Sequence, residues 1–258
     1  MSKVIIFDVG GVIATDAYNV VLEQVYGNNK IPHDQFESLM KTAHASWKTY
    51  KYGTIDEETF WMSIINEHYA VMHEYEHVLE NFQFINGADD ASRKRHYVQY
   101  LSKLLRSNLR LFTETLDLIE KLENNLEQHP KLAAIGILSN HSKEWSHYIY
   151  SEMSNGRVAK LFEKNLFTTG SHSSDLIIWS CDVNLAKPEA EIYELMIRRV
   201  QQQVGQDIQP GDICFIDDKD RNLEVAKKLG IHTILYDAFL PEQYKFSDFE
   251  KEIYSFLQ

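Results

Sequence analysis

Acidic, hydroxyl and ammonium side chains stand beside apolar segments that are far apart in the sequence. Asp8 follows the first of these segments directly, and Ser139 follows the second. Asp217 and Asp218 follow the fourth, and Lys187 stands ahead of it. The ligands of an open parallel sheet bind beyond the carboxyl ends of its strands. We therefore expect these side chains to converge on one edge of one sheet.

This set of groups suits the binding of a divalent cation and a phosphate. Carboxylates gathered without a cation repel one another and resist ionisation. Mg²⁺ binds one or two carboxylates together with waters and phosphate oxygens of a substrate. Lys187 can pair with the acids, while Ser139 and the Gly10-Gly11 backbone can cradle phosphate oxygens. The sequence thus predicts Mg²⁺ as the cofactor and a small phosphorylated molecule as the partner.

Five short apolar segments have the character of strands in a buried parallel sheet, because they are apolar on both faces. They are Val4–Phe7, Ala133–Leu138, Leu176–Trp179, Ile213–Ile216 and His232–Tyr236. Segments with helical spacing of apolar residues lie between them, namely Thr113–Leu126, Lys143–Ser154, Ala190–Gln203 and Leu223–Leu229. This alternation predicts an α/β fold, a doubly wound, Rossmann-like parallel sheet.

The interval between the first two strands is far too long for one crossover helix. It carries apolar residues at three- and four-residue spacing throughout. The helical segments are Asn19–Tyr26, Asp34–Ala45, Asp56–Tyr69 and Arg93–Leu105, with Asp56 or Thr54 as a helix N-cap. We therefore predict two domains: an α/β core of residues 1–15 and 110–258, and an inserted helical domain of residues 16–109.

The composition excludes several classes of partner. The 258 residues include 26 Lys and Arg against 38 Asp and Glu, a formal charge of −12, whereas a nucleic-acid binder needs clustered basic residues. The sequence has no run of about 18 apolar residues, so it predicts no membrane span. Val4–Phe7 is too short for a secretory signal. Cys181 and Cys214 are too far apart to suggest a disulfide framework or a zinc site. We expect a cytoplasmic protein without nucleic-acid or membrane partners.

The order of these motifs resembles the haloacid dehalogenase-like superfamily of aspartyl-phosphate hydrolases. Asp-x-Gly-Gly-Val follows the first strand, Leu-Ser-Asn the second, and Lys-Pro precedes Ile-Asp-Asp. The resemblance covers residues 1–15 and 110–240, and the helical insertion 16–109 falls where that superfamily places its cap. Within the superfamily, the sequence is similar to the branch with glucose-1-phosphate phosphatases and epoxide hydrolase amino-terminal domains. Three motifs carry this similarity: the Gly-Gly variant, Lys-Pro-Glu-x-x-x-Tyr and the segment Gly53–Trp61.

The resemblance implies a Mg²⁺-dependent phosphatase acting on a small phosphomonoester, such as a sugar phosphate. Asp8 matches the nucleophile, which becomes a transient aspartyl phosphate. Ser139 and the backbone of Asn140 match groups that bind the transferring phosphoryl group. Lys187 matches the residue that neutralises charge on the nucleophile and on the phosphoryl oxygens.

The resemblance also implies a metal site. Asp8 and the carbonyl of Gly10 would ligate Mg²⁺ together with an acid from the Asp217-Asp218 pair. Asp218 is our preferred direct ligand, and Asp217 would bind directly or through water.

The sequence departs from the common family pattern at Gly10, where a second aspartate usually acts as general acid and base. Loss of such a group typically costs about 10²- to 10⁴-fold in rate. A good leaving group, His141 or a group of the cap could compensate, although a histidine there is more typical of a helix end or the surface. Alternatively, the protein is a weak or inactive relative that binds a phosphorylated ligand or a protein, or a dehalogenase. The retained Asp217-Asp218 pair favours the phosphatase.

Two groups of side chains in the insertion carry less specific signals. Aromatic residues are concentrated there and are typical of helix packing, although one or two could line a cleft: Trp47, Tyr50, Tyr52, Phe60 and Trp61. His73 and His77 are four residues apart but have no third ligand nearby, so we assign no metal to them. We expect the histidine-rich segment Glu67–His77 to be a solvated surface.

Overall fold

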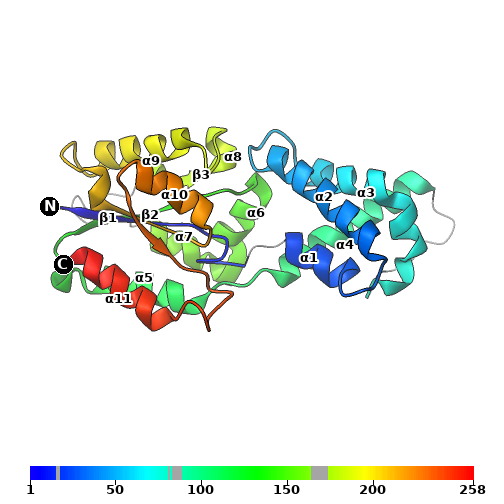
Figure 1. Ribbon diagram of the computed structural model, residues 1–258, viewed down its shortest axis with the longest axis horizontal. Coiled ribbons are helices and arrows are strands. Elements are labelled where there is room, and N and C mark those ends of the chain that lie inside the picture. The colour runs from blue at the N-terminus through cyan, green and yellow to red at the C-terminus, as the bar shows by residue number, and fades with distance from the viewer. Residues whose placement is uncertain (16–17, 81, 83–88, 164–173) are drawn as a thin grey trace. The chain divides into compact units, whose positions relative to one another are not determined.

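The computed structural model describes residues 1–15, 18–80, 82, 89–163 and 174–258. The chain forms two compact units, one of residues 1–15 with 110–258 and one of residues 16–109. We call them the sheet unit and the helical unit, and Figure 1 labels their elements.

Five parallel strands form the sheet of the sheet unit, in the order β3-β2-β1-β4-β5. Their bounds are β1 Lys3–Phe7, β2 Leu132–Ser139, β3 Ile177–Trp179, β4 Ile213–Asp217 and β5 His232–Leu235. Each predicted strand end lies within one residue of the observed end. The predicted parallel α/β sheet is therefore confirmed.

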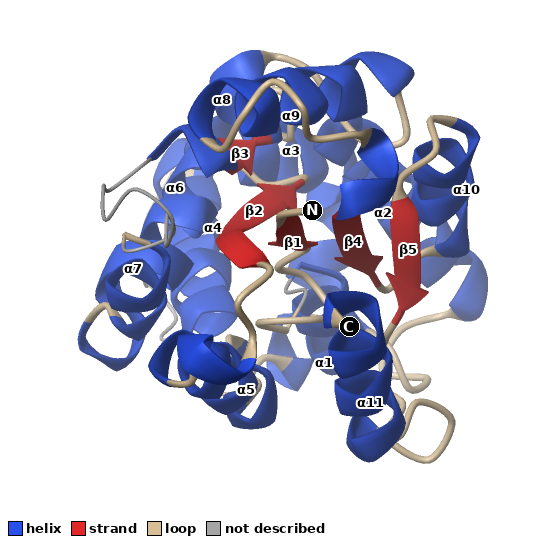
Figure 2. Cartoon of the chain, turned by 90° about the vertical axis from the view of Figure 1, so that its left-hand side faces the viewer, coloured by secondary structure: helices blue, strands red, loops and turns tan. Residues whose placement is uncertain are grey.

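Helices cover both faces of this sheet, because its strands are apolar on both sides. Val4 and Ile6 belong to a core cluster that includes residues of the two helices after Lys187 and Asp217. Phe7 points to the other face, where its ring meets Phe162 edge-on at a centroid distance of 6.3 Å. Figure 2 shows α9 and α10 on one face of the sheet and α5, α7 and α11 on the other.

The helices of the sheet unit partly follow the predicted pattern. Their bounds are α5 Thr113–Asn124, α6 Lys143–His147, α7 Arg157–Phe162, α8 Ser180–Val183, α9 Ala190–Gln203, α10 Asp220–Lys228 and α11 Phe246–Leu257. The predicted single helix 143–154 is wrong, because α6 ends at His147 and is followed by a π-helical turn and a 3-10 turn. The helical run ends at Met153, whose backbone is extended, and Ser154 follows in the left-handed region with a φ of 50°. Helix α10 begins three residues earlier than predicted, and α11 was not predicted.

The helical unit consists of α1 Tyr18–Tyr26, α2 His33–Tyr50, α3 Glu57–Glu74 and α4 Asp90–Asn108. Asp56 caps α3 as predicted, accepting a hydrogen bond from the Thr59 N–H at 2.8 Å. Tyr50 and Phe60 stack at a centroid distance of 4.8 Å, so aromatic side chains pack inside the unit. None of the helices in the described part of the chain combines the length and apolar character needed to cross a membrane.

The prediction of a solvated histidine-rich surface is wrong for His68. This side chain is buried at a bend of α3, where the backbone φ of −113° departs from helical geometry. Its Nε2 atom lies 2.8 Å from Thr42 Oγ1 of α2. His68 continues the buried stripe of Trp61, Ile65 and Met72 at helical spacing, whereas His73 and His77 are exposed.

Gly136, in the middle of β2, is a point where the sheet tolerates no side chain. A Cβ atom there would lie 2.5 Å from the Leu176 carbonyl oxygen and 2.8 Å from Ile6 Cδ1. We expect Gly136→Ala to lower the free energy of unfolding by about 1–3 kcal/mol, as overpacking does in other cores. Urea unfolding of the full chain measures the change. Gly211→Ala is the control, because its nearest neighbour would be 3.7 Å away; equal losses in both variants would contradict the packing argument.

Candidate active site

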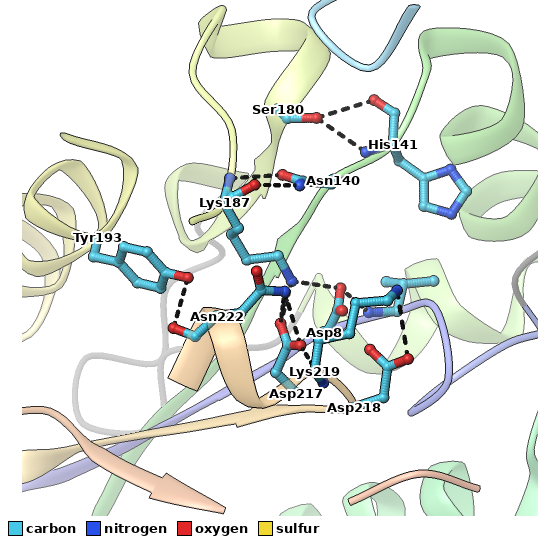
Figure 3. A network of polar contacts seen from close by, with 11 residues as sticks. Asp8, Asn140, His141, Ser180, Lys187, Tyr193, Asp217, Asp218, Lys219 and Asn222 are labelled. Carbon is cyan, nitrogen blue, oxygen red and sulfur yellow. Dashed lines mark hydrogen bonds and ion pairs between the residues drawn. The ribbon is translucent and has the colours of Figure 1, made fainter. Parts of the chain in front are cut away.

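The acidic residues predicted from the sequence come together beyond the carboxyl ends of β1 and β4. Asp8 follows β1 directly, Asp217 is the last residue of β4, and Asp218 is the next residue. Each offers a carboxylate oxygen, and these oxygens lie within 4.8 Å of one another. Figure 3 shows them together with the Lys187 side chain.

Lys187 neutralises two of these acids from the interior. Its Nζ atom lies 2.9 Å from Asp8 Oδ1 and 2.6 Å from Asp217 Oδ2, and only 1% of its side chain is exposed. A buried charge is tolerated only when it is paired and hydrogen-bonded. Both carboxylates therefore stabilise the charged form of Lys187, and its ammonium group stabilises their ionised forms.

Asn140 and Ser180 fix the loops that carry Lys187 and His141. The Asn140 side chain accepts a hydrogen bond from the Lys187 N–H and donates one to the Lys187 carbonyl, both at 2.8 Å. The Ser180 hydroxyl oxygen accepts from the His141 N–H at 3.0 Å. The sequence analysis assigned Asn140 only a backbone contact with phosphate, but its side chain clamps the lysine backbone.

The two neighbouring aspartates have different surroundings. Asp217 accepts hydrogen bonds from Asn222 Nδ2, at 2.9 and 3.0 Å to its two oxygens, and from the Lys219 N–H at 2.8 Å. Tyr193 in turn donates to the Asn222 carbonyl at 2.9 Å. Asp218 Oδ1 is buried and makes no hydrogen bond in the described part of the chain. Asp217 is thus held by protein donors, whereas Asp218 keeps an oxygen available for a ligand.

The loop after Asp8 approaches Asp218 so closely that Gly11 is required. Gly11 has a φ of +79°, and a Cβ atom on it would lie 2.7 Å from Asp218 Cβ, Cγ and Oδ2. Its carbonyl accepts a hydrogen bond from the Ala238 N–H at 2.8 Å, which ties the loop to the segment after β5. The Val9 N–H donates to Asp8 Oδ1 at 2.7 Å.

The electrostatics of the cluster separate Asp8 from Asp218. Burial opposes ionisation of Asp8, but the positive charges of Lys187 and Lys219 outweigh it and hold the pKa of Asp8 below its usual range. Burial, followed by repulsion from Asp8, raises the pKa of Asp218 to about 7. Asp8 is therefore suited to act as an anion. Asp218 has Lys219 beside it and still needs a further positive charge to ionise fully near neutral pH.

These donors fit a hard divalent cation. They are carboxylate oxygens grouped within 4.8 Å, and one of them, Asp218 Oδ1, is buried without a hydrogen-bond donor among the described residues. Oxygen donors of this kind are those that Mg²⁺ prefers. Ser139 Oγ, at the end of β2, is also buried and makes no hydrogen bond with suitable geometry in that part of the chain.

Several residues of this network were not predicted from the sequence. Asn222, in the first turn of α10, donates a hydrogen bond from its side chain back to Asp217. Its five-residue spacing from Asp217 was the available signal. Lys219 was not considered, although it directly follows the acids. His141 was expected at a helix end or on the surface, yet it is 3% exposed and packs edge-on against Trp179.

Comparisons with known sequences identify the class of protein. A family model for haloacid dehalogenase-like hydrolases matches residues 2–230, which confirms the resemblance. Over 61 residues, 24% of this chain, the sequence is 36% identical to bifunctional epoxide hydrolase 2 of Sus scrofa. Over 63 residues, also 24%, it is 38% identical to acyl-CoA dehydrogenase family member 10 of Mus musculus. These matches span only 10% and 5% of the two relatives.

Solved structures share the fold over nearly the whole chain. A haloacid dehalogenase family enzyme of Bacteroides thetaiotaomicron, in complex with magnesium and inorganic phosphate, superposes with a TM-score of 0.58 and 21% identity. The alignment covers 91% of this chain and 94% of that one. A dehalogenase structure has a TM-score of 0.52 and 15% identity, with coverage of 91% and 84%. At 21% and 15% sequence identity, these similarities are evidence for a shared fold alone.

The raised pKa of Asp218 predicts the pH dependence of stability. Its pKa of about 7 lies above the ordinary 3.8, so in metal-free protein the folded state loses stability as the pH rises through this window. Asparagine does not ionise. We therefore expect Asp218→Asn to raise the free energy of unfolding by about 1–3 kcal/mol at pH 8, with a gain that shrinks as the pH falls from 7 towards 4.

Urea unfolding in EDTA at a series of pH values measures this difference. Asp207→Asn, on an exposed residue, serves as the control and should show no such trend. An Asp218→Asn variant that is less stable than the native protein at pH 8 would refute the argument.

Proposed function

The chain belongs to the haloacid dehalogenase-like hydrolase family, and we propose that it is a Mg²⁺-dependent phosphatase that hydrolyses a small phosphomonoester, such as a sugar phosphate. The observation that carries this proposal is the pairing of an ionised Asp8 with a neighbouring Asp218 whose buried oxygen has no donor in the described chain. A candidate nucleophile and a carboxylate oxygen available to a cation then lie within 4.8 Å of each other. The magnesium and phosphate of the structurally similar Bacteroides enzyme support the same chemistry.

Asp8 is the proposed nucleophile. Lys187 and the Val9 N–H both contact Oδ1, so we assign the attack on phosphorus to Oδ2. As the new oxygen–phosphorus bond forms, the bond from phosphorus to the leaving oxygen breaks, which leaves an aspartyl phosphate. Water then attacks this phosphorus, releases inorganic phosphate and restores the Asp8 carboxylate.

The remaining residues bind and orient the phosphoryl group. Ser139 Oγ can donate its proton to a phosphoryl oxygen, which would satisfy this buried hydroxyl. Lys187 neutralises charge on the nucleophile and on the phosphoryl oxygens, with the Asn140 side chain holding its backbone. We also assign the Gly10-Gly11 and Asn140 backbones to the phosphate cradle.

Asp8, Asp218 and the Gly10 carbonyl would hold Mg²⁺, and Asp217 would act through water because its oxygens already accept protein hydrogen bonds. The bound cation would supply positive charge to the phosphoryl oxygens. We propose the helical unit, residues 16–109, as the cap that the family resemblance implies.

A dehalogenase is the competing proposal, since the family resemblance associates this activity with the absence of a second acid, as at Gly10. The acid pair after β4 argues against it, because the cluster needs a cation that halide displacement by a carboxylate does not require. A silent relative that only binds a phosphorylated ligand or a protein would bind without turnover.

Mg²⁺-dependent hydrolysis of p-nitrophenyl phosphate tests the assignment. We expect activity that EDTA abolishes, and a kcat at least about 10³-fold lower in Asp8→Asn, because the amide oxygen is a poor nucleophile. Asp207→Asn is the matched control on an exposed aspartate. Activity that survives in Asp8→Asn would overturn the nucleophile, and halide release from haloacids without metal would support the dehalogenase.

Gly10→Asp tests what the missing acid costs. Gly10 is not among the described residues with positive φ, so its backbone conformation does not oppose a side chain. We expect the variant to raise kcat for an alkyl phosphate by about 10²-fold, because an alkoxide needs a proton as it leaves. Hydrolysis of p-nitrophenyl phosphate should change little, since nitrophenolate leaves without one. No gain with the alkyl phosphate would mean that another group already supplies the proton.

A further inference from the structure

Lys219 is a second lysine at the acid cluster, and its backbone is fixed from both sides. Its N–H donates to Asp217 Oδ1 at 2.8 Å, and its carbonyl accepts from the Asn222 N–H at 2.9 Å. Its side chain returns towards the cluster, where Nζ lies 3.4 Å from Asp218 Oδ2. Figure 3 shows the ammonium groups of Lys187 and Lys219 on opposite sides of the Asp8 carboxylate.

The two lysines differ in their freedom to move. The Lys187 side chain is 1% exposed and bound to Asp8 and Asp217, so its ammonium cannot leave without stranding two buried charges. The Lys219 side chain is 37% exposed, and its contact with Asp218 is longer. A lysine ammonium on a flexible stem can exchange partners while its backbone stays in place.

The charges of the cluster determine which partner the Lys219 ammonium prefers. Three carboxylates and two ammonium groups leave the ionised cluster with a formal charge of −1. A divalent cation on Asp218 repels the Lys219 ammonium beside the same carboxylate, whereas a phosphoryl dianion attracts it. Since Asp8 and Asp218 oxygens lie within 4.8 Å of each other, a phosphoryl group on Asp8 would be within reach of the Lys219 side chain.

We propose that Lys219 is an exchangeable counter-ion of this site: its ammonium pairs with Asp218 until Mg²⁺ binds, and then pairs with the phosphoryl group of the substrate. Lys219 thereby weakens the binding of Mg²⁺ alone and strengthens the binding of phosphate to the Mg²⁺-loaded protein. This inference rests on the proposed phosphatase function, but it concerns a residue for which that proposal gives no role.

Calorimetric titration at pH 8 tests both halves of the exchange. Mg²⁺ is titrated first into metal-free protein, and inorganic phosphate is then titrated into protein saturated with Mg²⁺. We expect Lys219→Met to bind Mg²⁺ about three- to tenfold more tightly and phosphate about three- to tenfold more weakly, as removal of a partly exposed charge allows. Lys219→Arg, which keeps the charge, should restore both affinities to nearly native values.

Lys228→Met is the matched control, because it removes the same charge from an exposed position at the other end of α10. If Lys219→Met and Lys228→Met have equal affinities, or if only one of the two shifts occurs, the exchange is wrong while the phosphatase proposal stands. Native protein that binds no Mg²⁺ and shows no Mg²⁺-dependent hydrolysis would overturn both. Lys219→Gln provides a second neutral variant should Lys219→Met unfold at a lower temperature.

Discussion

The buried ammonium of Lys187 is the charge on which the functional edge of the sheet depends. A cation with 1% side-chain exposure is stable only between its two carboxylates, which come from neighbouring strands β1 and β4. Asn140, which follows β2, holds the backbone of the same lysine. One ion-pair network thus joins the ends of the three central strands, and the spacing of the reactive groups follows from it.

This arrangement keeps Asp8 ionised, whereas it opposes the ionisation of Asp218. Lys187 directly contacts Asp8 and Asp217, whereas the pKa of Asp218 rises to about 7 through burial and repulsion from Asp8. Sites that bind ligands commonly carry such unfavourable interactions, which the rest of the fold must offset. The surrounding apolar core of β1, β2 and β4 supplies that support.

The strands and the acid cluster could be predicted because their signals are local. Apolar runs of strand length mark the sheet, and the acids directly follow them. Contacts that depend on tertiary geometry could not be predicted. The clamp between Asn140 and Lys187 joins residues 47 positions apart, and His68 is buried against Thr42 of another helix. The helical run after α6 ends at the extended Met153, ahead of a left-handed segment from Ser154 to Gly156.

The central position of β1 has a consequence for how the chain folds. Its neighbours are β2 and β4, so that Ile5 pairs with Ile135 on one side and with Cys214 on the other. During synthesis, one side of this strand can pair only after β2 (Leu132–Ser139) has been made, and the other side only after β4 (Ile213–Asp217). The helical unit is continuous in sequence, so its contacts are complete much earlier. Assembly of the surroundings of Asp8 is consequently a late, long-range step of folding, with the slow kinetics typical of such contacts.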